Sequence, residues 1–418
     1  MSRRGASVGD LTTLGGQLLP LRNRAFRLLA LATLGSSIGT LLAAVALAID
    51  IKDRTNSGYW VGAVLVVAWL PTLVVGLTLG PLIDRLERRK LMIGADLVRA
   101  GVFAALPFTS RPATIVALAA VAGLASGFFR PAVYAGIPNL VPEEQLPVAN
   151  GLLQAMENIS WAIGPILGGV LAAAAGPHAA YWLNSVSFVF SAVLIARIPA
   201  RLLQSKTALS RGHWRDLRDG FSVVAHSRAL LAVLFAWGIA SLGFGASNVS
   251  EVFLAKNVFH SGDWGYGLIY GAIGIGLIVG SAFSSISLAR FGAARTYGGA
   301  LLLMAIGLAG AAASPDIWVA SACCIVSGCG NGAAVACNYL LVQRGTTDDL
   351  RGRALTVVMS ATLVLSATAY GIGGYLLNVV GTRWIWAGAG GACAVAALVG
   401  YLIAREPRAV RVTTQPAH

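Results

Sequence analysis

The chain has 418 residues, of which 56% are hydrophobic and only 11% are charged. Soluble proteins usually carry about a quarter of charged residues, and a soluble core cannot bury this much apolar sequence, so an ordinary soluble domain is excluded. The net charge of +14 is spread over short segments between hydrophobic runs, which is typical of membrane topology and not of nucleic-acid binding. We therefore expect an integral membrane protein surrounded by the lipid bilayer, with no nucleic-acid partner.

Twelve apolar runs are long enough to cross a bilayer, because a spanning helix needs about 20 residues. They predict helices over residues 26–49, 59–80, 91–110, 113–133, 150–173, 179–199, 229–253, 264–287, 297–314, 316–339, 354–379 and 384–404. The ninth and tenth runs are the least distinct, since only Ser314, Pro315 and Asp316 separate them. The sequence thus predicts an all-α membrane protein with twelve transmembrane helices.

The basic residues predict the orientation, because lysine and arginine are enriched on the cytoplasmic side of membrane proteins. If the N-terminus is cytoplasmic, most of the 31 basic residues fall on that side. The outer side then holds only Lys52, Arg54, Arg111, Lys256 and Arg383. We expect a multi-pass protein of the inner (cytoplasmic) membrane with both termini in the cytoplasm.

A hydrophilic segment near the middle divides the chain into two halves of six helices. The predicted parts are a cytoplasmic tail over 1–25, an N-terminal half over 26–199, a linker over 200–228, a C-terminal half over 229–404 and a second cytoplasmic tail over 405–418. Residues 213–221 in the linker predict an amphipathic helix on the inner membrane surface. A short acidic loop followed by a helix closing on Gly-Gly occurs in both halves, at Gly168-Gly169 and at Gly373-Gly374. Two six-helix pseudo-repeats are typical of secondary transporters.

The loop after the second predicted helix combines glycine, aspartate and a basic run. It reads Gly80-Pro81-Leu82-Ile83-Asp84-Arg85-Leu86-Glu87-Arg88-Arg89-Lys90. Glycine permits a tight turn, and Asp84 is placed to pair with arginine or to cap the next helix. Anchoring at an anionic inner leaflet explains the basic run, but it does not explain glycine and aspartate at this spacing.

This stretch resembles the loop motif of the major facilitator superfamily, with Glu87 where the family usually has a small residue. The segments 96–100, 127–132 and 137–143 resemble the drug-exporter branch that includes macrolide and siderophore efflux proteins. The resemblance implies a major facilitator fold and a cytoplasmic charge network that breaks and reforms as the two halves rock. This gating network would comprise Asp84, Arg88, Arg89, Asp96 and Arg130. The alternative is that the basic residues only anchor the loop.

The fifth predicted helix carries a row of small residues with one proline. They are Gly151, Ser160, Gly164, Pro165, Gly168 and Gly169. The spacing resembles the antiporter motif of the family's exporters, with Ser160 in place of its middle glycine. Proline bends a helix and glycines allow close packing, so ordinary membrane packing is the alternative reading. Gly267, Gly271, Gly276 and Gly280 on the eighth predicted helix offer a partner surface.

Glu157 and Glu251 are carboxylates within predicted spans, where a charged group costs about 2.5 to 3.5 kcal/mol on insertion scales. Glu157 lies in the fifth span, and Gln154, Asn158 and Trp161 share its helical face. We expect this face to bind substrate or to carry the coupling proton, with a structural ion pair as the alternative. Glu251 near the outer end of the seventh span is the second candidate, with a position at the water interface as its alternative.

The sequence therefore favours a secondary active exporter of small amphiphilic molecules, such as drugs and antibiotics, that exchanges them for protons by alternating access. The alternatives are an uptake symporter or uniporter of the same fold and a non-transporting membrane sensor or scaffold. No nucleotide-binding loop, catalytic motif or metal-ligand spacing is present, so we expect no cofactor, no metal and no enzymatic activity. The resemblance implies a monomer.

Overall fold

The structure is a computed structural model that describes residues 17–78, 86–204, 227–346 and 351–404, together with 222, 224 and 225. Within these residues the secondary structure is helical, and no strand occurs. The first half contains α2 (Arg24–Thr55), α3 (Gly58–Thr78), α5 (Arg88–Ala105), α6 (Pro112–Gly136), α7 (Leu146–Ala175) and α8 (Pro177–Ala196). The second half contains α10 (Arg228–Ala232), the π-helical η7 (Val233–Trp237), α11 (Gly238–Phe253), the π-helical η8 (Leu254–Val258), α12 (Gly262–Ala313), α13 (Ile317–Gly345), α14 (Arg351–Val380) and α15 (Thr382–Ala404).

Local sequence signals fix several helix starts. The side chain of Asn23 accepts hydrogen bonds from the backbone N–H groups of Ala25 and Phe26 and so caps α2, as expected for an N-cap asparagine. Asp316 caps α13 in the same way, through Trp318 and Val319. This cap explains why a separation of three residues suffices to end one apolar run and start the next.

Ten helices among the described residues are long and apolar enough to cross a membrane. The α3 helix adds a shorter apolar stretch, Gly58–Thr72, and α12 enters this count once although it has 52 residues. The predicted all-helical membrane architecture is therefore confirmed. The number of twelve spans stays a prediction.

The long helix α12 reverses direction at a single residue. A straight helix of its length would extend for about 78 Å, whereas the hydrocarbon core is about 30 Å thick. Gly292 has φ 76° and ψ 168°, values outside the helical region that glycine adopts at little cost. A Cβ atom added at Gly276 would touch Gly328, and one added at Gly307 would touch Ser327. Both arms of α12 therefore pack against the same turn of α13, and they match the separate helices predicted over 264–287 and 297–314.

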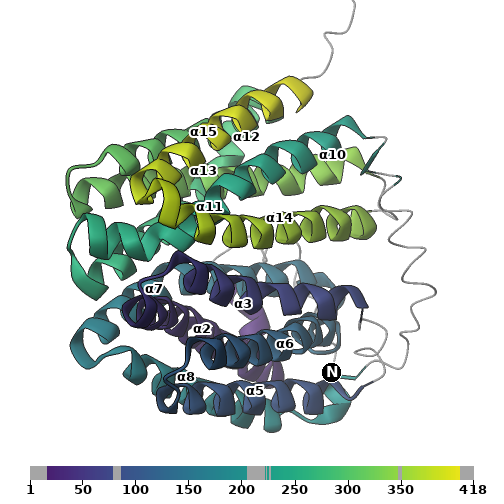
Figure 1. Cartoon of the computed structure of the whole chain (residues 1–418). Helices are drawn as coiled ribbons and strands as arrows, with labels where there is room; N and C mark the ends of the chain where they lie inside the picture. The colour runs from purple at the N-terminus through teal and green to yellow at the C-terminus, as the bar shows by residue number, and fades with distance from the viewer. Residues whose placement is uncertain are drawn as a thin grey trace, which may run out of the picture.

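The two halves form two bundles that lie against each other, the N-terminal half below and the C-terminal half above in Figure 1. In the first, α2 packs against α7 and α8, and in the second, α11 packs against α14 and α15. These pairs correspond in chain order, and the two pseudo-repeats stay a prediction. The predicted amphipathic helix over 213–221 lies outside the described residues, as do residues 1–16 and 405–418 of the predicted tails.

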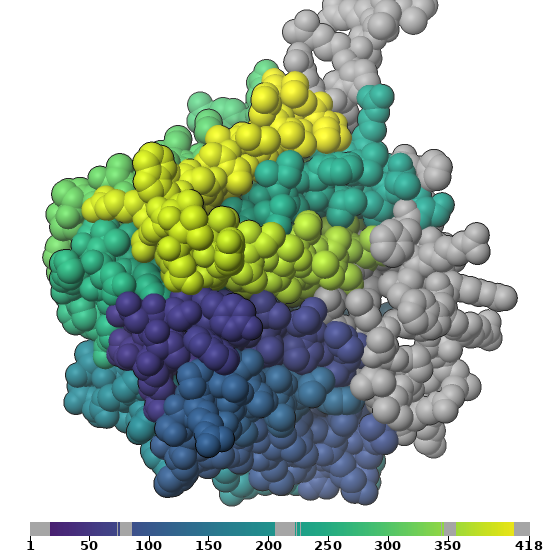
Figure 2. All heavy atoms as spheres, viewed as in Figure 1, coloured from purple at the N-terminus to yellow at the C-terminus, as the bar shows by residue number. Residues whose placement is uncertain are grey.

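The halves touch along two seams in which backbone meets backbone. In the first seam, α7 meets α12, and a Cβ atom added at Gly169 would lie 2.7 Å from the Cα atom of Gly267. In the second seam, α3 meets α14, and a Cβ atom added at Gly58 would lie 2.7 Å from the carbonyl oxygen of Gly374. Figure 2 shows this second contact as the boundary between the purple and the yellow-green helices. Only glycines permit such an approach.

An ion pair joins the halves at the same end of the molecule. The Lys256 ammonium lies 2.7 Å from an Asp53 oxygen at the end of α2 and 2.5 Å from an Asp263 oxygen at the start of α12. Gly58 and Gly374 also lie at this end. We call it the Lys256 end, defined by Asp53, Gly58, Lys256, Asp263 and Gly374.

Candidate functional site

A cavity of about 350 Å³ lies between the two halves, within the range of small-molecule sites. The N-terminal half contributes Ala44 and Val45 from α2, Leu65 and Trp69 from α3, and Trp161 from α7. The π-helical segment η7 and helices α11, α12, α13 and α14 supply the remaining wall. Side chains from both halves line the cavity, so any movement of one half relative to the other would change its shape.

Both seams run from the cavity to the Lys256 end. Along α12, Gly274 lines the cavity against Trp161, and Gly267 packs against Gly169 closer to the Lys256 end. Along α14, Tyr370 lines the cavity and Gly374 meets Gly58 one turn further on. The cavity is therefore closed toward the Lys256 end in this structure.

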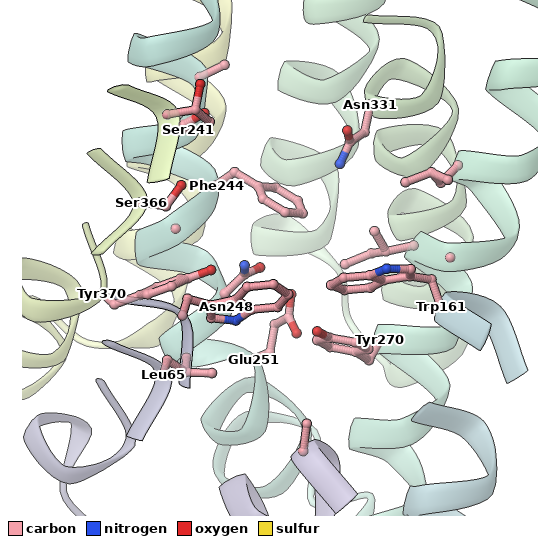
Figure 3. Close-up of a pocket in the computed structure, with 18 of the residues that line it drawn as sticks. Leu65, Trp161, Ser241, Phe244, Asn248, Glu251, Tyr270, Asn331, Ser366 and Tyr370 are labelled. Carbon is pink, nitrogen blue, oxygen red and sulfur yellow. The ribbon is translucent and has the colours of Figure 1, made fainter. Parts of the chain in front are cut away.

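Glu251 on α11 is the carboxylate of the cavity (Figure 3). Its exposed fraction is 0%, and neither carboxylate oxygen has a hydrogen-bond partner among the described residues. Asn248 lies one turn earlier on the same helix, and Tyr270 reaches into the cavity from α12. A buried carboxylate without a partner is costly, so this side chain is a candidate for contact with an occupant of the cavity.

Irregular helix geometry brackets Glu251. The π-helical segment η7 precedes α11, and η8 begins three residues after Glu251, at Leu254. Each π turn carries more residues than an α turn and rotates the faces of the flanking helix, and such turns are frequent at functional sites. The local geometry thus determines which face of α11 looks into the cavity.

Stacked aromatic rings cross the cavity from one half to the other. The rings of Trp69 and Trp161 are 6.3 Å apart with an interplanar angle of 15°, and those of Trp161 and Tyr270 are 6.1 Å apart at 16°. Tyr266 continues the row edge-on at 6.0 Å from Tyr270. Ring faces attract cations and apolar groups. Beside Glu251, this row gives the cavity wall one carboxylate and several ring faces.

Glu157, our first sequence candidate, does not line this cavity. One oxygen of Glu157 lies 2.8 Å from a nitrogen of Arg130, and the other accepts a hydrogen bond from the Tyr134 hydroxyl at 3.1 Å. Gln154 donates to Asn158 at 3.3 Å, outside the cavity wall. Of the polar and aromatic face predicted on this helix, Trp161 is the member that reaches the cavity. The alternative reading of Glu157, a structural ion pair, is the arrangement seen.

The residues predicted to form one gating network have separate partners here. Arg130 pairs with Glu157, and Asp96 pairs with Arg99, which is buried between the rings of Phe129 and Phe188. The Arg88 guanidinium donates to the carbonyl oxygens of Ala135 and Leu203, and that of Arg89 donates to the carbonyl of Ala196. Gly80, Asp84 and Arg85 lie outside the described residues. A gating role for these residues stays a prediction.

The residues of the antiporter-like motif on α7 lie in three different environments. Nothing lies within 4 Å of a Cβ atom added at Gly151, whereas Gly164 and Gly168 pack against α2 of the same half. Gly169 packs against α12 of the other half, and the Pro165 carbonyl touches Gly267. The Ser160 hydroxyl is buried and donates to the Met156 carbonyl at 2.8 Å.

The partner surface predicted on α12 is divided between two neighbours. Gly267 and Gly271 face α7 as expected. Gly276 and Gly280 instead face α13.

The sequence did not predict that Lys256 forms an ion pair between the two halves. It also did not predict four residues of the cavity wall: Trp69, Asn248, Tyr266 and Tyr370. It named Glu251 as its second candidate, with a position at the water interface beside Lys256 as the alternative. The structure instead directs Lys256 to Asp53 and Asp263 and leaves Glu251 fully buried.

Comparison with known proteins identifies the family. A family model described as transmembrane secretion effector matches residues 15–415. An uncharacterized MFS-type transporter, YkuC of Bacillus subtilis (strain 168), is 29% identical over 283 residues, which is 63% of this chain and 65% of its own length. Macrolide efflux protein A of Streptococcus pyogenes is 28% identical over 206 residues, 48% of this chain and 51% of its own length. The putative bacilysin exporter BacE of Bacillus subtilis (strain 168) is 27% identical over 232 residues, 54% of this chain and 58% of its own length. The chain thus aligns with about half to two thirds of these relatives.

Solved structures show the same fold. The nucleoside transporter NupG superimposes with a TM-score of 0.72 at 14% identity, covering 92% of this chain and 100% of NupG. A bacterial homologue of the iron transporter ferroportin, in an inward-facing state, gives a TM-score of 0.74 at 16% identity, covering 92% of this chain and 99% of the homologue. Together with the helical architecture and the extent of the family match, these likenesses show that the chain belongs to the transmembrane secretion effector family of the major facilitator superfamily, a family of membrane transporters and not of enzymes.

Proposed function

We propose that this protein exports small amphiphilic molecules across the cytoplasmic membrane by alternating access, in exchange for protons. The observation that carries the proposal is Glu251, a fully buried carboxylate without a partner among the described residues, in an aromatic cavity between the two halves. In an exporter of this kind, a proton and the substrate bind in turn to the same carboxylate, and each neutralises its charge.

The chemistry of Glu251 suits such an exchange. A carboxylate in the membrane interior is costly while ionised and unpaired, so it binds either a proton or a cationic or hydrogen-bond-donating part of a substrate. Each occupant lowers the affinity for the other, and this coupling is reciprocal, typically about 1 to 3 kcal/mol. Protons that enter from outside therefore promote substrate release there, and substrate that enters from inside promotes proton release to the cytoplasm.

The closed Lys256 end supports alternating access. According to the distribution of basic residues, this end faces outward, so the structure corresponds to a state closed to the outside. The contacts that close it are backbone seams and an exposed ion pair, which separate without unfolding either half. Rocking of the two halves about the cavity would open this end and expose Glu251 to the outer side.

The export direction is supported by two of the relatives, which are described as a macrolide efflux protein and a putative bacilysin exporter. The antiporter-like row on α7 supports the same direction by resemblance. By resemblance to the family's exporters, we propose that the monomer is the functional unit.

Transport in inside-out membrane vesicles tests this proposal, with a panel of fluorescent amphiphilic dyes, cationic and neutral, as substrates. The vesicle lumen corresponds to the outside of the cell, so an exporter should accumulate dye in the lumen when the lumen is more acidic than the medium. A protonophore should abolish the accumulation.

Each other outcome contradicts a defined part of the proposal. Accumulation that resists the protonophore would exclude proton exchange. Dye uptake into whole cells, together with none into inside-out vesicles, would show an uptake carrier. No flux of any dye in either direction would indicate a sensor or scaffold in place of an exporter of amphiphiles.

A further inference from the structure

A second cavity of about 330 Å³ lies between α5 and α6, two neighbouring helices of the N-terminal half. It shares no lining residue with the cavity that contains Glu251. Its wall consists of Lys90, Leu91, Gly94, Ala95 and Val98 on α5, and of Val121, Leu124, Ala125 and Phe128 on α6. Apart from Lys90, every lining residue is apolar. We call this cavity the α5–α6 groove.

The groove faces the bilayer and not the protein interior. Val98 is 46% exposed, and Val121 and Leu124 are each 42% exposed, although all three are apolar. Gly94 leaves the groove open because it has no side chain. A Cβ atom added there would point into empty space, with no atom within 4 Å. A larger residue at this position would fill the space between the two helices.

The length of the groove suits one acyl chain of a single leaflet. Lys90 and Val98 are eight residues apart on α5, which corresponds to about 12 Å along a helix. Half of the hydrocarbon core measures about 15 Å. The groove therefore extends over most of the depth that a lipid tail occupies in the leaflet nearest to Lys90.

The end of the groove at Lys90 is positively charged. The Lys90 side chain is 81% exposed and has Glu87 as an ion-pair partner at 2.7 Å. The guanidinium groups of Arg88 and Arg89 donate to backbone carbonyl oxygens, which do not neutralise charge. The segment from Glu87 to Lys90 thus holds three cations and one carboxylate, and the excess positive charge attracts an anion at the membrane surface.

We propose that the α5–α6 groove binds one anionic phospholipid, with an acyl chain along Gly94 and Val98 and the phosphate at Lys90. An apolar channel of leaflet depth with a basic entrance matches the two parts of such a lipid. A neutral lipid would fill the channel without neutralising the entrance. The proposal is independent of the exporter function, because the groove and the Glu251 cavity are separate.

Native mass spectrometry of the purified full-length protein tests the site, with phosphatidylglycerol and phosphatidylcholine of identical chains as probes. The wild type should bind phosphatidylglycerol about fivefold more tightly, the effect of one basic residue near an anionic headgroup. Lys90→Gln should remove this preference and leave phosphatidylcholine binding unchanged. Gly94→Leu should weaken the binding of both lipids, because leucine occupies the channel.

Gly101→Leu is the matched control, since Gly101 lies two turns further along the same face of α5, is equally open and is not part of the groove wall. A photoactivatable phosphatidylglycerol should crosslink to peptides that contain 91–98 or 121–128 in the wild type and lose these crosslinks in Gly94→Leu. Equal binding of the two lipids by the wild type would overturn the proposal. Equal effects of Gly94→Leu and Gly101→Leu, or crosslinks confined to other helices, would overturn it as well. Lys90→Gln decides the outcome if Gly94→Leu does not fold.

Discussion

Replacement of Glu251 by glutamine is expected to abolish the dependence of transport on the proton gradient and to leave the fold intact. Glutamine has nearly the same shape but exchanges no proton, so the cavity loses the group on which proton and substrate compete. A coupling free energy of about 1 to 3 kcal/mol corresponds to a stimulation of transport of about 5- to 150-fold when the outer side of the membrane is the more acidic one. This stimulation should disappear when dye accumulation in inside-out vesicles is compared with and without an acidic lumen.

The melting temperature of Glu251→Gln should stay unchanged or rise, because the substitution removes a buried charge without a partner among the described residues. Glu157→Gln is the matched control. It breaks an ion pair with Arg130, whose side chain is 57% exposed, and such pairs contribute at most about 1 kcal/mol. Transport by Glu157→Gln should therefore remain gradient-dependent. If Glu157→Gln abolished the gradient dependence and Glu251→Gln preserved it, the coupling site would lie on α7 and not on α11.

Gly169→Ala is expected to hold the Lys256 end open. An added Cβ atom would lie 2.7 Å from the Cα atom of Gly267 and 3.0 Å from the carbonyl oxygen of Asp263, both in the opposite half. Such overpacking costs about 1 to 3 kcal/mol, and the cost arises only while the halves are closed at this end. The ratio of open to closed molecules should rise by about 5- to 150-fold, and transport should slow because the closed state is visited less often.

Labelling of a cavity cysteine from outside measures this shift. Ser241→Cys places a thiol in the cavity wall, in a background where the five native cysteines are replaced. A membrane-impermeant maleimide should label it faster when Gly169→Ala is present.

Two other glycines of α7 provide the controls for this experiment. At Gly151 an added Cβ atom meets nothing, so Gly151→Ala should leave labelling and melting temperature unchanged. At Gly168 it would lie 2.5 Å from the Leu42 carbonyl oxygen in the same half. Gly168→Ala should therefore lower the melting temperature without faster labelling. Faster labelling in Gly151→Ala would show that the effect does not come from the seam.

The helical membrane architecture was predictable because a spanning helix needs an apolar run of a minimum length and because basic residues concentrate on the cytoplasmic side of a membrane. These two rules act on each segment separately, so they require no knowledge of tertiary contacts. Boundaries were harder, and α12 shows why. The apolar runs predicted its two arms, with Arg290 and Arg295 in the gap between them, but the turn is a single glycine conformation, and the hydrophobic pattern does not reveal that the helix resumes directly after Gly292.

The site was less predictable because it depends on how helices are rotated and paired. The sequence placed Glu157 and Trp161 on one face of α7, but Trp161 lines the cavity whereas Glu157 pairs with Arg130 on α6, and only the tertiary structure reveals that ion pair. Glu251 was the second candidate from the sequence, with a position at the water interface beside Lys256 as its alternative. The π turns η7 and η8 change the rotation of this segment, and helical periodicity does not report such turns.

The turn at Gly292 has a consequence for how the protein is made. Because no hydrophilic loop separates the two arms of α12, residues 262–313 enter the membrane during synthesis as one helical hairpin. Arg290 and Arg295 flank the turn, and in the predicted orientation they hold it on the cytoplasmic side. Both arms then pack against α13, which is translated next. The contacts of the hairpin with α13 therefore form only after Ile317–Gly345 has emerged from the ribosome, whereas its partner helix α7 has been synthesised earlier.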